Sequence, residues 1–184
     1  MEIQTTPIAG LLILKPQVFC DQRGYFMETY NRERYRAAGI DADFVQDNQS
    51  CSSYGVVRGL HFQRPPFTQA KLVSCLIGRV LDVAVDLRKG SPTYGQHFAV
   101  ELTAENHLQF FIPHGFAHGF SVLSETATFA YKCDNFYHPE AEGGLMLSDE
   151  DLHIDWQVPA DQRILSDKDQ HHPLFRDLQS PFQW

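Results

Sequence analysis

The middle of the chain is built from short segments in which apolar and polar residues alternate, and this pattern limits the folds that the chain can adopt. The clearest instance is KLVSCLIGRVLDVAVDL at residues 71–87, where apolar side chains at every second position from 81 to 87 face one side of a strand. Asp82 and Asp86 face the other side. Gly78 and the residue after it suit a two-residue turn, so the segment predicts a β-hairpin.

Further strands are predicted after this segment, separated by residues that favour turns. They cover residues 97–102, 108–113, 118–124 and 126–133. Only NRERYRAAG at 31–39 predicts a helix, with Asn31 as the N-cap and Gly39 at its end. The C-terminal part, rich in Asp, Gln, His and Pro, predicts irregular structure with short helical turns. We therefore expect an all-β fold, a jelly roll or a similar barrel, with both terminal segments wrapped around it.

Length and composition argue against several classes of protein. A chain of 184 residues, 43% hydrophobic and 21% charged, suits one domain over residues 1–184. The net charge of −8 argues against a broad surface for nucleic acid. No apolar run reaches the roughly 18–20 residues of a membrane span, and MEIQTTPIAG at the N-terminus does not resemble a signal peptide. Four cysteines without a CxxC pair are typical of reduced thiols, so we expect a cytoplasmic protein.

One predicted strand, GVVRGLHFQRP at residues 55–65, contains residues that an apolar strand does not need. It begins with two valines and continues with Arg58, Gly59 and His61. Strict alternation would place Arg58 and His61 on opposite faces of the strand. A bulge at Gly59 would turn both side chains towards one ligand, and we expect such a bulge here.

Two motifs resemble those of the cupin superfamily, whose fold is a jelly roll with short flanking helices. Gly55, His61 and Gln63, with Lys71 further on, resemble the first motif, and PHGFAH at 113–118 resembles the second. Where metal-binding cupins have their second histidine, this chain has Gln63. Where they have a glutamate, the nearest equivalent here is Lys71. Because an ammonium group cannot ligate a divalent ion and repels one at short range, we expect no metal.

Without a metal, these residues suit proton transfer next to a carbonyl group. The imidazole of His61 is a competent base near neutral pH, and the ammonium of Lys71 can stabilise an oxyanion on a carbonyl. An acid must return the proton, and Tyr131, which shares a strand face with Ala127 and Phe129, is the candidate. The alternative is that both residues are only structural, with His61 at the barrel rim and Tyr131 in the barrel wall.

Seven segments occur in order along the chain: DQRGYFMETY, FVQDNQS, VVRGLHFQ, AKLVSCLIGRVLDVAVDLRKGSPTYG, FIPHGFAHGF, YKCDNFY and LSDKD. Together they resemble the dTDP-4-dehydrorhamnose 3,5-epimerases, and the resemblance covers nearly the whole chain from about residue 3 to 170. The resemblance implies conversion of dTDP-4-dehydro-6-deoxy-D-glucose to dTDP-4-dehydro-L-rhamnose, in dTDP-L-rhamnose biosynthesis, without a cofactor. The chain also has no GxGxxG turn for a nicotinamide.

The resemblance implies roles for four catalytic residues. His61 matches the base that removes protons from C3 and C5 of the 4-keto sugar, and Lys71 would stabilise the enolate at O4. Tyr131 matches the acid on the opposite face of the ring. A C-terminal aspartate pairs with the histidine in the family, and we expect it to be Asp169, with Asp167 as the alternative. Such a carboxylate would hold one imidazole tautomer and stabilise its protonated form.

Substrate binding is assigned by the same resemblance. The residues implied are Arg23, Phe26, Glu28, Gln46, Asn48, Arg58, His118, Tyr137, Glu142 and Lys168. The guanidinium groups of Arg23 and Arg58 suit diphosphate oxygens, and the rings of Phe26 and Tyr137 suit stacking on thymine. In the family the counterparts of Arg23 and Phe26 come from the neighbouring subunit, so the resemblance implies a homodimer with strand exchange.

Three alternatives remain open at the level of the sequence. The first is an enzyme of the same fold that epimerises only C3 or only C5 of a related dTDP-4-keto-deoxysugar. The others are a metal-dependent cupin oxygenase and a nucleotide-sugar binding protein without catalytic activity. The segment after Asp169, QHHPLFRDLQSPFQW, matches no role in the family, and His171 and His172 are expected at the surface.

Overall fold

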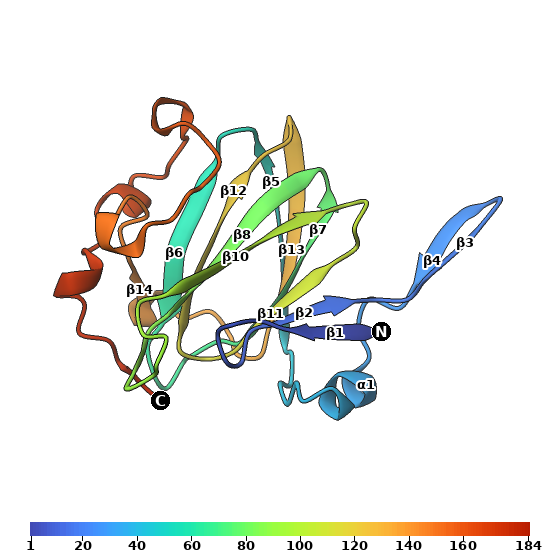
Figure 1. Cartoon of the computed structure of the whole chain (residues 1–184), viewed down its shortest axis with the longest axis horizontal. Helices are drawn as coiled ribbons and strands as arrows, with labels where there is room; N and C mark the ends of the chain where they lie inside the picture. The colour runs from blue at the N-terminus through green and yellow to red at the C-terminus, as the bar shows by residue number, and fades with distance from the viewer.

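Two antiparallel β-sheets pack face to face in the computed structural model, which covers residues 1–184 (Figure 1). The first sheet contains, in spatial order, β1 (Glu2–Thr5), β2 (Leu12–Lys15), β11 (Gln109–Ile112), β7 (Lys71–Ile77), β13 (Thr126–Cys133) and β5 (Gln46–Ser53). The second contains β10 (His97–Thr103), β8 (Arg79–Asp86), β12 (Phe116–Val122), β6 (Val57–Gln63) and β14 (Glu142–Gly144). The all-β prediction is confirmed.

The remaining elements lie around these sheets. They are a hairpin of β3 (Val18–Asp21) and β4 (Gly24–Met27), the helix α1 (Arg32–Ala37), the parallel pair β9 (Arg88–Lys89) and β15 (Phe182–Gln183), and the 3-10 turns η1 (Pro139–Ala141), η2 (Glu150–Leu152), η3 (Ala160–Gln162), η4 (Lys168–Gln170) and η5 (Phe175–Asp177). The helix begins as predicted, because the side chain of Asn31 accepts a hydrogen bond from the Arg34 amide. No helix is long and apolar enough to cross a membrane.

The predicted hairpin over residues 71–87 is wrong, although both of its strands exist. β7 pairs with β11 and β13, whereas β8 pairs with β10 and β12, so the chain crosses from one sheet to the other at Gly78. Gly78 has a φ of +78°, and a side chain there would meet the Thr126 carbonyl oxygen. Alternation identifies a strand and its faces, and a suitable turn shows where the chain reverses. Neither signal identifies the strand with which each segment pairs.

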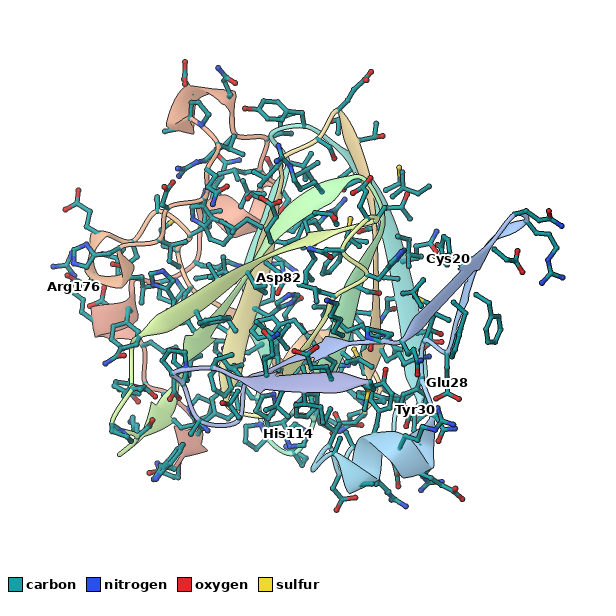
Figure 2. The ribbon with its side chains drawn as sticks, turned by 45° about the vertical axis from the view of Figure 1, so that its right-hand side comes forward. Cys20, Glu28, Tyr30, Asp82, His114 and Arg176 are labelled. Carbon is teal, nitrogen blue, oxygen red and sulfur yellow. The ribbon has the colours of Figure 1, made fainter.

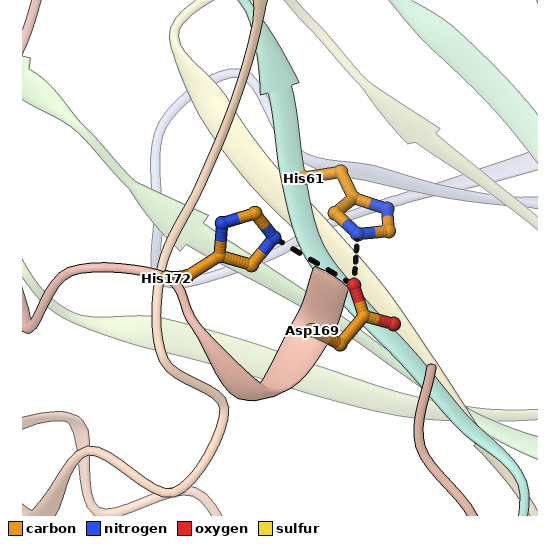
Figure 3. A group of neighbouring side chains, drawn as sticks. All are labelled: His61, Asp169 and His172. Atoms are coloured by element: carbon orange, nitrogen blue, oxygen red, sulfur yellow. Dashed lines mark hydrogen bonds and ion pairs between the residues drawn. The ribbon is translucent and has the colours of Figure 1, made fainter. Parts of the chain in front are cut away.

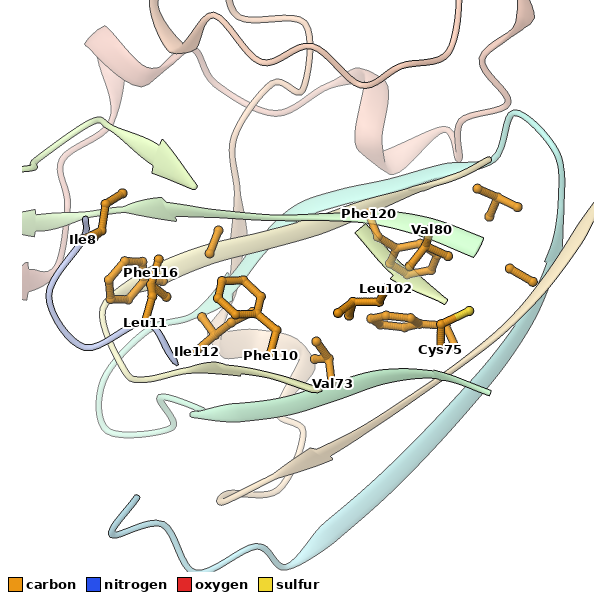
Figure 4. Packing of buried hydrophobic residues seen from close by; sticks show 14 residues of the cluster. Ile8, Leu11, Val73, Cys75, Val80, Leu102, Phe110, Ile112, Phe116 and Phe120 are labelled. Atoms are coloured by element: carbon orange, nitrogen blue, oxygen red, sulfur yellow. The ribbon is translucent and has the colours of Figure 1, made fainter. Parts of the chain in front are cut away.

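The main core lies between the two sheets and is rich in aromatic rings (Figure 4). Phe120 from the second sheet stacks on Phe129 from the first, with ring centroids 4.3 Å apart. Tyr131, two residues after Phe129, packs at the edge of this cluster, as its strand position predicts. The barrel interior therefore changes from apolar packing to polar side chains near Tyr131.

The C-terminal segment covers the outer face of the second sheet (Figure 1). Trp156 is fully buried in this second cluster, and its indole N–H donates to the Leu147 carbonyl. A third, smaller cluster packs Tyr35 of α1 against the first sheet. The last segment is thus held by apolar burial along its length, which brings η4 against β6.

Candidate active site

The strand β6 contains the bulge that the sequence predicts. His61 pairs with His118 and Arg58 pairs with Phe120, so the register between β6 and β12 shifts around Gly59. Gly59 has a φ of +124°, and a side chain there would lie 2.6 Å from the Gly119 Cα atom. Arg58 and His61 consequently line the same cavity.

That cavity, of about 670 Å³, gathers most of the residues predicted from the resemblance. They are Arg58, His61, Lys71, His118, Tyr131, Glu142, Lys168 and Asp169. A second cavity of about 280 Å³ shares four of these residues and adds Gln46, Asn48 and Tyr137. We call the two together the active-site cleft. Its residues come from both sheets and from the C-terminal segment.

His61 and Asp169 form a hydrogen-bonded pair at one side of the cleft (Figure 3). The distance from His61 Nε2 to Asp169 Oδ1 is 2.6 Å, and the Asp169 side chain is only 3% exposed. Burial alone would raise the pKa of Asp169, but the hydrogen bond from His61 and the bond with Ser166 hold it below its usual value. Asp167, the alternative partner, is exposed to solvent, so the geometry selects Asp169.

The ionised carboxylate determines which ring nitrogen of His61 is free. A carboxylate only accepts hydrogen bonds, so Nε2 of the neutral imidazole carries the proton that it donates to Asp169. The lone pair then lies on Nδ1, the one nitrogen left for a substrate. His61 is therefore arranged as a base whose protonated form faces a buried negative charge.

Lys71 and Tyr131 lie on the opposite sheet from His61. The ammonium of Lys71 on β7 is 5.9 Å from the ring centroid of Tyr131 on β13. Burial lowers the pKa of Lys71, although Cys133, Asp82 and Glu142 act against this shift. Burial also raises the pKa of Tyr131, so its phenol stays protonated and can donate a proton.

Asp82 is the buried partner of the cleft residue His118, and the sequence did not reveal this contact. Its carboxylate oxygens Oδ1 and Oδ2 lie 3.0 and 2.9 Å from His118 Nε2, from which they accept a hydrogen bond. Both side chains are buried inside the barrel (Figure 2). Burial raises the pKa of Asp82 and lowers that of His118, because the charged form of each loses water. Alternation correctly separates Asp82 from its apolar neighbours, but it does not show that this face points into the barrel.

A polar network forms the rim of the cleft. Glu142 accepts from Lys168 at 2.5 Å and from the Tyr137 hydroxyl at 2.9 Å. The Gln46 side chain donates to Asn48 and accepts from the Tyr137 amide at 3.0 Å. These bonds hold the exposed ring of Tyr137 over the second cavity.

Gln63, in the position of the second cupin histidine, supports this rim. Its buried side chain donates to the carbonyls of Phe67 and Phe136 and accepts from the His138 amide. All of its partners are backbone groups of the loops beside Tyr137. The side chain therefore has a complete set of partners and a structural task in this chain.

Three of the predicted binding residues lie outside the cleft of this chain. Arg23 is at the tip of the β3–β4 hairpin and pairs with Asp21, and the Phe26 ring is 70% exposed. Glu28 accepts hydrogen bonds from Asn31 and Arg34 near the start of α1. The hairpin projects away from the two sheets (Figure 1), so these side chains do not reach His61.

The expected surface position of His172 is wrong. His171 is exposed, but the His172 side chain is 12% exposed and its ring lies edge-on to His61, with centroids 5.6 Å apart. The segment is held there because the Met146 amide donates to the Pro173 carbonyl. Nothing in the local sequence distinguishes the two histidines, because the difference comes from packing on β14.

Comparison with known proteins identifies the family. The sequence model of the dTDP-4-dehydrorhamnose 3,5-epimerase family matches residues 5–177. The chain belongs to this family. It is 49% identical to the dTDP-4-dehydrorhamnose 3,5-epimerase of Shigella flexneri, over 96% of this chain and 97% of that protein. The activity is therefore 3,5-epimerisation in the dTDP-rhamnose pathway.

Solved structures of the epimerase family have the same fold. The enzyme of Elizabethkingia anophelis is 56% identical, with a TM-score of 0.93 and 98% of each chain covered. The Legionella pneumophila epimerase, solved with dTDP-4-keto-L-rhamnose, is 48% identical, with a TM-score of 0.95 over 100% of this chain and 98% of that chain. The cupin-type jelly roll that the motifs predict is confirmed by these structures.

Proposed function

We propose that His61 and Tyr131 perform the epimerisation as base and acid on opposite faces of the sugar ring. His61 removes the protons next to the 4-keto group, and Tyr131 donates protons from the other side. The supporting observation is the pair formed by His61 and the buried Asp169 carboxylate, 2.6 Å apart in a cleft that also contains Tyr131. Stabilisation of the imidazolium by Asp169 follows from this contact.

The position of the two residues in the barrel suits inversion at carbon. Inversion requires that a proton leaves one face of the carbon and another arrives on the opposite face. His61 lies on β6 of the second sheet and Tyr131 on β13 of the first, so a sugar between the sheets has one residue on each side.

Lys71 supplies the positive charge for the enolate. Proton loss next to the ketone places negative charge on O4, and the half-buried ammonium of Lys71 lines both parts of the cleft. One such electrostatic contact typically contributes about 3 kcal/mol to the transition state. Because the charge belongs to the protein, the mechanism needs no cofactor.

The nucleotide is bound by the remaining residues of the cleft and its rim. Arg58 offers a fork of donors to the diphosphate, and it already contacts Ser52 on β5. The exposed Tyr137 ring offers one face for the thymine. His118, with the rim residues Gln46, Asn48, Glu142 and Lys168, then surrounds the sugar and the phosphates.

We infer that Arg23, Phe26 and Glu28 act in the cleft of a second subunit. The β3–β4 hairpin pairs with neither large sheet and exposes the rings of Phe26 and Tyr25, which is a large apolar area for an isolated hairpin. A groove of about 470 Å³ lies between this hairpin and the outer face of the first sheet. A homodimer with exchanged hairpins would cover these surfaces.

A mixing experiment tests the shared site. The variants His61→Asn and Arg23→Ala are each purified and then allowed to exchange subunits. If Arg23 serves the partner, one cleft of each mixed dimer is intact and activity rises above that of either variant. No recovery in dimers shown to be mixed would refute hairpin exchange.

Deuterium incorporation tests the reaction and the base together. In D₂O the wild-type enzyme should place deuterium at both C3 and C5 of the sugar, which nuclear magnetic resonance locates. His61→Asn should abolish this exchange while dTDP still binds in calorimetry. Exchange at the wild-type rate in this variant would refute the role of His61, and label at one carbon would indicate a mono-epimerase.

We further infer that residues 1–184 act as one catalytic domain in the cytoplasm. The C-terminal segment supplies Asp169 to a cleft built from both sheets, so neither sheet alone contains the site. All four cysteines are free thiols, which suits a reducing compartment. Fractionation of the producing cells tests the location, and limited proteolysis tests the single domain.

A further inference from the structure

We propose that His61, Asp169 and His172 form a binding site for a zinc ion, and that the bound ion inhibits the enzyme. The three side chains bring two imidazole nitrogens and one carboxylate oxygen together, all within 4.8 Å of one another. Two histidines and one carboxylate are a common donor set for zinc in proteins. This site differs from the usual cupin metal site, whose second histidine and glutamate are replaced here.

The two histidine nitrogens converge on one carboxylate oxygen. Both histidines point their Nε2 atoms at the same oxygen, Asp169 Oδ1, at 2.6 Å from His61 and 3.6 Å from His172 (Figure 3). Tetrahedral zinc with bonds near 2.0–2.1 Å separates its ligand atoms by about 3.3 Å. The two N···O distances differ from this spacing by less than about 1 Å. The distance between the two histidine nitrogens is at most 4.8 Å, so it exceeds the spacing by no more than about 1.5 Å.

His172 provides the second observation. Its Nε2 atom is buried and has no hydrogen-bond partner, although buried polar atoms almost always have one. The ring is fixed against Gly144, since a Cβ atom there would lie 2.5 Å from Nε2. A metal ion would give this nitrogen a partner.

The three residues border two cavities, and the cleft is the side from which an ion would enter. His61 and Asp169 line the 670 Å³ cavity of the cleft, and His172 lines a neighbouring cavity of about 310 Å³. Three protein ligands with a fourth position open to solvent is the arrangement of exchangeable zinc sites. The nearby charges of Lys168 and Glu142 neutralise each other in an ion pair, so neither dominates the site.

Zinc at this site would disable the base. A neutral imidazole that coordinates through Nε2 carries its proton on Nδ1, whereas the active form carries it on Nε2 and uses the Nδ1 lone pair. The ion also takes the Asp169 oxygen that stabilises the imidazolium. The inhibition rests on the proposed role of His61, but the binding of zinc does not.

Three variants test the site by binding, independently of activity. We would titrate the metal-free protein with ZnCl₂ in a calorimeter, and with CoCl₂ while recording the visible absorption of tetrahedral cobalt. The wild-type chain should bind one ion, and His172→Ala should weaken binding at least about 100-fold. Gly144→Ala, which displaces the His172 ring without removing it, should also weaken binding. His171→Ala changes the exposed neighbouring histidine and should bind as the wild type does.

Activity is then measured by deuterium exchange at increasing zinc concentration. Wild type and His171→Ala should lose activity as the site fills, while His172→Ala should need at least about 100 times more zinc. Absence of binding, or equal binding by His172→Ala, would overturn the site. Stoichiometric zinc binding through His172 without loss of deuterium exchange would overturn the proposed inhibition. Deuterium exchange by His61→Asn without zinc separately tests whether His61 is the base.

Discussion

Replacement of Asp169 by asparagine isolates the electrostatic part of the proposed catalysis. The Asp169→Asn side chain has nearly the same shape, and its amide oxygen can still accept from His61 Nε2 at the observed distance of 2.6 Å. The main loss is the negative charge. A base must be neutral before it takes a proton, so the loss is small at that stage, but after proton abstraction the imidazolium no longer has a counter-charge.

The size of the effect follows from the geometry. Two opposite charges with centres about 4 Å apart attract each other by about 4 kcal/mol at the effective dielectric constant near a protein surface. Asp169 is almost completely buried, so solvent screens this attraction little. Since about 1.4 kcal/mol corresponds to a factor of ten, kcat should fall about 10³-fold. An amide that instead donates to Nε2 would move the imidazole proton to Nδ1 and increase the loss.

The assay is the rate of deuterium incorporation at saturating substrate, with dTDP affinity and thermal unfolding measured alongside. Asp167→Asn is the matched control, because it removes an exposed carboxylate two residues away. The control should keep nearly full activity, and both variants should bind dTDP as the wild type does. A loss below tenfold in Asp169→Asn, or an equal loss in the control, would refute the dyad.

Three further predictions concern charge and backbone. Lys71→Met should lower kcat about 10²–10³-fold yet raise the melting temperature. Burial places the folded-state pKa of Lys71 below its unfolded value of 10.5, so the charged ammonium destabilises the fold below that pH. A melting temperature of Lys71→Met below that of the wild type would contradict this. The folded-state pKa of Asp169 lies below its unfolded value of 3.8, so the ionised carboxylate stabilises the fold above that pH, and this stabilisation is lost in more acidic solution. The unfolding free energy of Asp169→Asn in denaturant melts should therefore be lower than that of the wild type at pH 7, and the two values should converge in acid. Gly59→Ala should destabilise the fold by about 1–3 kcal/mol in the same melts, because its Cβ would clash with Gly119.

The strands were predictable because their physical signal is local. Alternation between the two faces is a property of a few consecutive residues, and β10 to β13 end within two residues of their predicted bounds. Strand pairing is a different property. Residues 71–87 contain two strands and a suitable turn, but each strand finds its partners elsewhere, since a barrel interior must be enclosed by both sheets.

The cleft was predictable only in part. His61 and the bulge at Gly59 follow from an unusual polar pattern within one strand, whereas the pairing of His61 with Asp169, 108 residues away, rested on the family resemblance. Asp82 and His172 were not predicted, because their burial depends on segments that pack over them. Local sequence carries no information about such contacts, and a resemblance transfers only the roles that are already assigned.

Several ionisable groups are buried together in this barrel. A metal ion would bring positive charge to the substrate oxygen but would also need anionic ligands. Lys71 brings one positive charge on a side chain of the first sheet, and Asp82 and His118 lie on β8 and β12 of the second. Burial disfavours the charge of Lys71, and the nearby carboxylates of Asp82 and Glu142 favour it. In the proposed mechanism this balance leaves an incompletely neutralised cation in the cleft, and the enolate oxygen of the substrate would complete its neutralisation.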